Sequence, residues 1–163
     1  MEEVDKLRAL MALPPVSQLG VLVNDIDRAA DYYSSLFGLG PFTVYEFSPE
    51  KVWLWEKPSH IRVKQGKAMW GQIELELIQP LGGESIYTEF LRDHGEGIQH
   101  LGFNVVNYDE MFHRFEEAHF TPLMRVESYV DTYKGDLRCC SFDTRRVGGI
   151  VFEIIWKSWL MGT

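Results

Sequence analysis

Two stretches of the chain share one pattern of hydrophobic and polar positions. Residues 18–27, QLGVLVNDID, match residues 100–109, HLGFNVVNYD, at a leucine, a glycine, a valine and an aspartate. Each stretch alternates as a strand does and then continues with apolar residues at helical spacing. The first helical pattern ends at Gly38, and Asn107 with Glu110 has the spacing of a capping box at the start of the second. Each half of the chain is therefore predicted to begin with a strand and a helix.

The two halves also end alike. LELI at 75–78 corresponds to FEII at 152–155, which aligns Glu76 with Glu153. The offset is 82 residues between Gln18 and His100 and 77 between the two glutamates, so the repeat spans a whole module.

Strand-like segments fill the interior of each half. They lie near 41–47, 51–56 and 60–70, with turns at Ser48–Pro49 and Lys57–Pro58, and near 122–129 and 135–142. Each module is therefore predicted to be β-α-β-β-β. The fold class is α+β, with two such modules forming a curved mixed sheet around one cavity. We predict an N-terminal extension (1–15), a first module (16–80), a linking helix (81–97) and a second module with a C-terminal tail (98–163).

Two carboxylates occupy apolar strands. IVFEIIW, 150–156, is apolar on both faces except at Glu153, and a buried charge is costly unless it is paired or bound to a metal. In IELELIQP, 73–80, Glu74 and Glu76 lie on one face because side chains alternate along a strand. Each glutamate alone could point to water from a half-exposed strand. Their matching places in the repeat favour a shared functional site instead.

Pairing of the modules would bring four side chains together near the pseudo-twofold axis. These are Gln18 and His100 from the first strands and Glu76 and Glu153 from the last strands. One imidazole, one amide oxygen and two carboxylates suit a divalent first-row metal better than a structural zinc site, which normally uses thiolates. We therefore predict one divalent ion, Zn, Ni, Co or Mn, at the centre of the cavity.

Composition narrows the class of protein. With 163 residues, 45% of them hydrophobic, the chain can bury a sizeable core, and its net charge of −8 argues against a nucleic-acid partner. The adjacent Cys139 and Cys140 form no disulfide framework and are interpreted as core residues. The acidic start is typical of neither a signal nor a transit peptide, and no apolar run reaches membrane-spanning length. The sequence predicts a cytoplasmic globular protein that binds no membrane.

The motifs over about residues 16–157 resemble the vicinal oxygen chelate superfamily, which includes glyoxalase I, methylmalonyl-CoA epimerase, extradiol dioxygenases and bleomycin-resistance proteins. They are QLGVLVNDIDRAADYYSSLFGL, IELELIQPLGGES, HGEGIQHLGFNV and GGIVFEIIW. The resemblance implies metal ligands at Gln18, Glu76, His100 and Glu153. It also implies a small-molecule substrate, either an acyl-CoA or a glutathione adduct, and a homodimer, to which the apolar side of VDKLRALMAL would contribute.

The resemblance points to two subgroups. The loops around Pro80 and His100 look most like those of the epimerase, whereas the ligand order Gln-Glu-His-Glu is similar to that of animal-type glyoxalase I. The epimerase's second catalytic glutamate is expected on the strand before Glu76, but residues 61–70 contain no carboxylate. Lys67 is the substitute we predict there, on the condition that burial lowers its pKa.

The chemistry implied is removal of a proton next to a metal-polarised carbonyl. Glu153 is the predicted base, because apolar surroundings should raise its pKa when it is off the metal, and Glu76 is the second choice. We predict a metal-dependent isomerase or lyase, epimerase-like, with glyoxalase-type isomerisation as the alternative. A metal-free protein that binds a small molecule is a further alternative. An extradiol dioxygenase is disfavoured, because it would use two histidines and one carboxylate, and the sequence offers His100 alone at the expected ligand positions.

Overall fold

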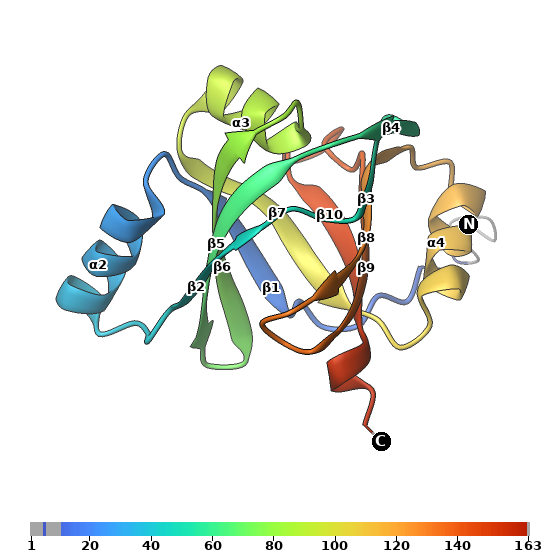
Figure 1. The fold of residues 1–163 in the computed structure, drawn as a ribbon. Coiled ribbons are helices and arrows are strands. Elements are labelled where there is room, and N and C mark those ends of the chain that lie inside the picture. Colours follow the sequence, from blue (N-terminus) through green and yellow to red (C-terminus); the bar gives the residue numbers. More distant parts are fainter. Residues whose placement is uncertain (1–4, 6–10, 163) are drawn as a thin grey trace.

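The computed structural model describes residue 5 and residues 11–162 (Figure 1). Its elements, in chain order, are β1 (Gln18–Leu22), α2 (Ile26–Phe37), β2 (Thr43–Phe47), β3 (Lys51–Leu54), β4 (Lys57–Ser59), β5 (Arg62–Trp70), β6 (Ile73–Gly82), α3 (Ile86–His94), β7 (Gly97–Asn104), α4 (Tyr108–Glu117), β8 (Pro122–Val130), β9 (Gly135–Phe142), β10 (Val151–Lys157) and the 3-10 helix η1 (Ser158–Leu160). None of the described helices is long and apolar enough to cross a bilayer.

The strands form one curled, mixed sheet in the order β2-β5-β6-β1-β7-β10-β9-β8-β3-β4. The two predicted repeats occupy its two halves, β2-β5-β6-β1 and β7-β10-β9-β8. In each half the first and last strands of the repeat pair in parallel, β1 with β6 and β7 with β10. The halves meet where β1 and β7 pair antiparallel. The predicted fold class, two βαβββ modules in a curved sheet, is confirmed.

The helices cover the outside of this half-barrel. Figure 1 shows α2 and α4 on opposite sides of the sheet and α3 across one end. Ile26 of α2 and Phe115 of α4 are buried in separate apolar clusters beneath their helices, and a third cluster lies inside the half-barrel next to α3. The helix ends follow the sequence signals: Asn107 caps α4, and Gly38 ends α2 with a φ of 67°, which glycine adopts without strain.

The predicted path of the chain through residues 51–59 is wrong in one respect. The segment was expected to belong to the sheet of the first module, but β3 pairs with β8 of the second half. The expected turn at Lys57–Pro58 lies two residues earlier, at Trp55 and Glu56, which both have positive φ as a two-residue hairpin loop requires. The β3–β4 hairpin therefore crosses from the first half to the far edge of the second.

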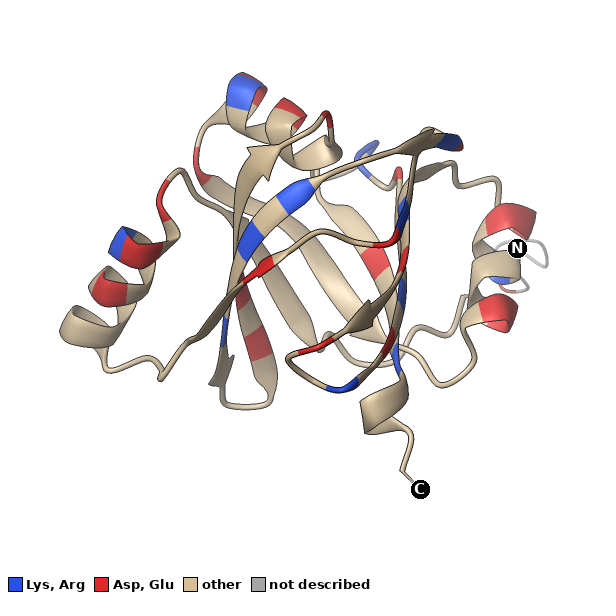
Figure 2. Cartoon of the chain, viewed as in Figure 1, with Lys and Arg blue, Asp and Glu red and all other residues tan. Residues whose placement is uncertain are grey.

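The predicted division into extension, modules and linking helix stays a prediction, because this exchanged hairpin makes the halves interdependent. Most of the stretch VDKLRALMAL lies outside the described residues. Figure 2 shows basic and acidic residues mixed on α2, on α3 and along the strands, without a wholly basic face in this view.

Candidate metal centre

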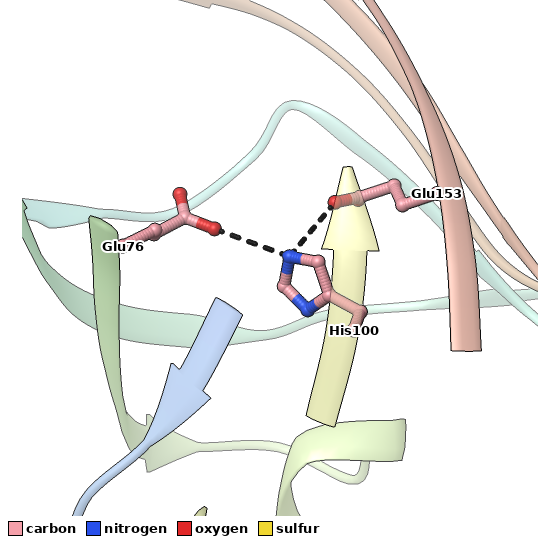
Figure 3. Close-up of side chains that lie close together, drawn as sticks. All are labelled: Glu76, His100 and Glu153. Atoms are coloured by element: carbon pink, nitrogen blue, oxygen red, sulfur yellow. Dashed lines mark ion pairs between the residues drawn. The ribbon is translucent and has the colours of Figure 1, made fainter. Parts of the chain in front are cut away.

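The four predicted ligands converge in the middle of the half-barrel. Gln18 lies on β1, Glu76 on β6, His100 on β7 and Glu153 on β10, and the exposed fraction of each is 4% or less. Three oxygens face the Nε2 atom of His100: Gln18 Oε1 at 3.3 Å, Glu76 Oε2 at 3.5 Å and Glu153 Oε2 at 3.2 Å. Figure 3 shows the two carboxylates reaching toward this nitrogen from opposite sides.

The repeated Leu-Gly pair explains how the ligands fit between two adjacent strands. Gly20 lies opposite His100 across the β1–β7 pair, and Gly102 lies opposite Gln18. A Cβ on Gly20 would come within 1.9 Å of the imidazole Cε1 atom, and one on Gly102 within 2.8 Å of the Gln18 Cβ atom. Each glycine therefore makes room for the ligand that the other half contributes.

The tautomer of His100 follows from its neighbour Gln99. The Nδ1 atom lies 2.7 Å from Gln99 Oε1, which can only accept a hydrogen bond, so Nδ1 carries the proton that it donates. This arrangement leaves Nε2 as the atom directed at the three oxygens. A hydrogen-bonded partner on the other ring nitrogen is typical of metal-binding histidines.

The orientation of Gln18 is set in the same way. Its Nε2 atom donates to Glu74 Oε1 at 2.7 Å, which turns Oε1 toward His100. Glu74 was recognised in the sequence as a residue on the same face as Glu76, but its role in orienting Gln18 was not.

The donor set fits a divalent cation. Three oxygen acceptors and one imidazole nitrogen in a dry site repel one another unless a cation lies among them. Ligand atoms that bind one ion at about 2.1 Å lie roughly 3.0 to 3.4 Å apart, close to the separations found here. The ligand atoms of Glu76, His100 and Glu153 all lie within 4.8 Å of one another.

In the absence of such an ion, a proton must fulfil this role. Burial disfavours the charged form of His100, but Glu153 and Glu76 outweigh it and raise the pKa of the imidazole above its ordinary value.

The two glutamates have different surroundings. Glu76 Oε1 lies 3.1 Å from Lys67 Nζ and accepts a hydrogen bond from Gln65 Nε2, also at 3.1 Å. Burial alone would raise the pKa of Glu76, but the Lys67 ammonium and the contact with His100 lower it to about 2. Glu76 is therefore ionised over the whole physiological range.

Glu153 has no lysine beside it. Burial raises the pKa of its carboxyl above the ordinary value, although His100 and a hydrogen bond with Cys139 oppose this shift. The direction agrees with the expectation from its apolar strand. A carboxyl group whose pKa is moved toward neutrality can both take and return a proton.

Lys67 does not meet the condition placed on it as a base. Burial would lower the pKa of its ammonium, but Glu76 outweighs burial and raises the pKa well above the ordinary value. Lys67 lines the same cavity, with its ammonium 6.0 Å from the ring centroid of Tyr45 and 5.7 Å from that of Tyr133. It therefore stays charged and cannot accept a proton.

The cavity around these residues is small, about 40 Å³, which is room for about three water molecules. Phe47 and Pro49, from the segment joining β2 to β3, form part of its wall. Tyr45 contacts Tyr133 edge to face, with ring centroids 6.0 Å apart, and so connects β2 to the β8–β9 turn. The cavity accommodates the reacting end of a substrate and not a whole cofactor-sized molecule.

Several cavity residues were missed in the sequence because nothing local distinguishes them. Cys139, interpreted as a core residue, is buried but also lines the cavity beside Glu153. Gln65, Gln99 and Lys157 had no assigned role. Alternation along β5 and β10 could have placed Gln65 with Lys67, and Lys157 with Glu153, on one face of each strand.

Comparison with known proteins identifies the family. The sequence model of the Glyoxalase/Bleomycin resistance protein/Dioxygenase superfamily matches residues 17–137, more than half of the chain. The chain belongs to this superfamily. No curated protein matches it.

Solved structures support the same fold at low identity. A methylmalonyl-CoA epimerase from Mycobacterium tuberculosis is 21% identical, with a TM-score of 0.62 over 91% of this chain and 94% of that one. A Streptomyces coelicolor methylmalonyl-CoA epimerase in complex with 2-nitronate-propionyl-CoA is 16% identical, with a TM-score of 0.62 over 90% and 99%. A hypothetical protein from Bacillus halodurans C-125 is 18% identical, with a TM-score of 0.62 over 88% and 94%. These structures show the fold that the chain adopts.

Proposed function

We propose that this superfamily member is a metal-dependent isomerase or lyase that moves a proton on the carbon next to a carbonyl group. The observation that carries the proposal is the unequal setting of the two glutamates. Glu76 is held ionised by Lys67 and Gln65, whereas Glu153, which is equally buried, forms no ion pair with a lysine among the described residues and has a raised pKa. Two titratable groups with pKa values pushed apart are typical of an acid–base site.

Gln18, Glu76, His100 and Glu153 would hold the ion, which when bound supplies Lewis-acid polarisation of the substrate's carbonyl oxygen. Glu153 takes the proton from the neighbouring carbon, and the C–H electron pair moves toward the carbonyl. In the isomerisation Glu153 then returns the proton to the former carbonyl carbon, and the proton of the neighbouring hydroxyl group passes to the former carbonyl oxygen, so that atoms and electrons balance without a redox partner. The two glutamates and His100 are almost fully buried, which limits loss of this proton to solvent.

Transfer between neighbouring carbons is the reaction that this geometry favours. An epimerase delivers a proton to the opposite face of the substrate, which generally requires a second acid–base group. Lys67 is tied to Glu76, and β5 contributes no carboxylate. A glyoxalase-type isomerisation uses one mobile base, and Gln18 agrees with that ligand set.

Epimerisation of an acyl-CoA is the second candidate. The loop motifs IELELIQPLGGES and HGEGIQHLGFNV favour it, and two of the similar structures are epimerases, one crystallised with an acyl-CoA analogue. Only the acyl end of such a substrate would enter the cavity. A metal-free binding protein is disfavoured, because it would have no need of two buried carboxylates facing an imidazole. The homodimer and the cytoplasmic location stay predictions.

The test is proton exchange in deuterated water. Protein loaded separately with Zn, Ni, Co or Mn would be given methylmalonyl-CoA or the hemithioacetal of methylglyoxal and glutathione. We expect turnover of the hemithioacetal, at least a 1,000-fold loss in Glu153→Gln, and no change in the control Glu46→Gln, which alters an exposed glutamate on β2. Deuterium incorporation and racemisation confined to methylmalonyl-CoA would select the epimerase instead. Full activity of Glu153→Gln on either substrate would refute the assigned base.

A further inference from the structure

Two buried lysines lie beside the metal centre. Lys67 on β5 and Lys157 at the end of β10 are 9% and 6% exposed, and both line the cavity that contains the ligand residues. Lysine is almost never buried to this degree without a partner. Among the described residues, Lys67 pairs with Glu76 at 3.1 Å, and Lys157 makes one longer ion pair, with Glu74 at 3.4 Å.

Both ammonium groups approach one oxygen of Glu74. Lys157 Nζ lies 3.4 Å and Lys67 Nζ 3.9 Å from Glu74 Oε1, which also accepts the hydrogen bond from Gln18. An ammonium has three N–H donors, and Lys157 makes a single hydrogen bond among the described residues. It therefore has donors to spare at the wall of the cavity.

The lysines are close to the atoms that would bind the metal. The Lys67 ammonium contacts the carboxylate of the ligand Glu76 directly. The Lys157 ammonium is connected to the ligand Gln18 through the carboxylate of Glu74. An anion held by these lysines would be near an oxygen held at the metal centre.

The charges of the site are balanced by one further anion. Glu74, Glu76 and Glu153 contribute three negative charges, and the two lysines with a divalent ion contribute four positive ones. The loaded site is thus left with a single positive charge in a largely dry cavity, where an uncompensated charge is costly. A substrate with one negative charge at its reacting end would neutralise it.

We propose that Lys157, together with Lys67, forms a subsite for the carboxylate of a small 2-hydroxy-, 2-oxo- or malonyl-type acid. The inference rests on the proposed function for the position of the substrate's carbonyl or hydroxyl oxygen at the metal centre. The carboxylate is recognised by charge-assisted hydrogen bonds from the ammonium groups. A substrate whose reacting end is neutral, such as the hemithioacetal, binds without this contribution, so the subsite raises affinity for acids that undergo the same proton transfer.

Lys157 is the better residue to change, because Lys67 contacts a predicted metal ligand and Lys157 does not. The probes are glycolate and glycolamide, which have the same number of heavy atoms and differ in one charge. Calorimetry would measure the binding of each to protein loaded with Mn, before and after Lys157→Met. The control is Lys64→Met, because Lys64 pairs with Asp27 outside the cavity.

We expect the wild type to bind glycolate at least tenfold more tightly than glycolamide. Lys157→Met should weaken the binding of glycolate about tenfold and that of glycolamide less than twofold. Lys157→Arg should retain most of the preference for glycolate over glycolamide. Lys64→Met should change the binding affinity for neither probe. If Lys157→Met does not fold, Lys157→Gln replaces it in the same comparison.

The subsite would be overturned if Lys157→Met weakened the binding of both probes equally or left the affinity for both unchanged. It would also be overturned if the metal-loaded wild type did not bind glycolate. The outcome is separate from that of the proposed reaction. A protein that exchanges no substrate proton but shows Lys157-dependent preference for glycolate would refute the reaction and leave the subsite standing.

Discussion

The two halves of the molecule have the same arrangement of strands and helix, but the buried glutamate of each half has different neighbours. Glu76 on β6 faces Lys67 on the adjacent strand β5, whereas Glu153 on β10 faces Ser141 at the equivalent place on β9. Gln65, which donates to Glu76, corresponds in the same way to Cys139. The repeat therefore places two carboxylates symmetrically, and the residues on the neighbouring strands give them different pKa values.

A second difference between the halves concerns the β3–β4 hairpin. The first half contributes this hairpin to the edge of the second, and the second half contributes nothing equivalent in the described residues. The segment that leads to it carries Phe47 and Pro49, which form part of the cavity wall. The first half thus contributes the carboxylate that is paired with a lysine and part of the cavity wall, and the second half contributes Glu153, the proposed base.

The largest effect is expected from Gly20→Ala, which breaks the fit between the halves. The new Cβ would overlap the His100 ring, so the imidazole must leave its place. We expect metal affinity to fall more than 100-fold and the protein to lose stability. Gly82→Ala is the matched control, because a Cβ there meets nothing within 4 Å. Metal titration of both variants decides the matter; unchanged affinity in Gly20→Ala would show that His100 is not a ligand.

Changes at the two equivalent positions facing the glutamates should differ strongly. Lys67→Met leaves Glu76 as an uncompensated buried charge, and we expect a loss of about 3 kcal/mol in the free energy of unfolding of the metal-free protein. Ser141→Ala should cost about 1 kcal/mol or less, because no charge depends on it. Urea denaturation measures both. Similar losses would mean that Lys67 does not hold Glu76 ionised.

The pKa shifts of Glu76, Glu153 and His100 determine how the stability of the metal-free protein changes with pH. The lowered pKa of Glu76 gives stability that is present above its ordinary 4.5 and is lost as pH falls toward about 2. The raised pKa values of Glu153 and His100 give stability that is lost as pH rises above 4.5 and 6.5, respectively, through their folded values. We therefore expect a maximum in the acid range.

Metal binding should reverse this loss at higher pH. The ion replaces the proton of the His100 ring, so its affinity should rise with pH and its binding should release about one proton near neutrality. Calorimetry in buffers with different heats of ionisation measures that release. Binding that releases no proton at neutral or mildly acidic pH would contradict the raised pKa of His100 in the metal-free protein.

The smallest effect concerns the exchanged hairpin. Arg125 on β8 makes two hydrogen bonds with Glu56 in the β3–β4 turn, at 3.1 and 3.3 Å, and its guanidinium lies 4.6 Å from the ring centroid of Trp53. Glu56→Gln should cost less than about 1 kcal/mol, because the pair is partly exposed. Metal affinity should not change. A large loss of metal would show that the hairpin supports the centre directly.

Much of the fold and the ligand set could be predicted, because both are encoded in a repeat. The matching Leu-Gly pairs and the similar offsets of 82 residues at the first strands and 77 at the glutamates predicted two modules. Pairing of β1 with β7 then brings Gln18 and His100 to one place. The raised pKa of Glu153 followed from its apolar strand. These features depend on residues that are close in sequence or related by the repeat.

The features that could not be predicted depend on which strands become neighbours. The alternation in KVWL indicates a strand at β3 but not that β8 is its partner. For the same reason Lys67 was considered as a base: its distance from Glu76 is a matter of strand register. Gln99 and Glu74, which orient two ligands, are ordinary polar residues until the sheet is assembled.

The division of roles between the two glutamates is tested most directly by infrared titration of the metal-free protein. As pH is lowered from neutrality, the absorption band of a protonated carboxyl group in the buried site should arise from Glu153. We predict that Glu153→Gln removes this band while Glu76→Gln retains it, and that Glu76 in the wild type gains a proton only as pH approaches about 2. A band that disappears in Glu76→Gln and persists in Glu153→Gln would contradict the account.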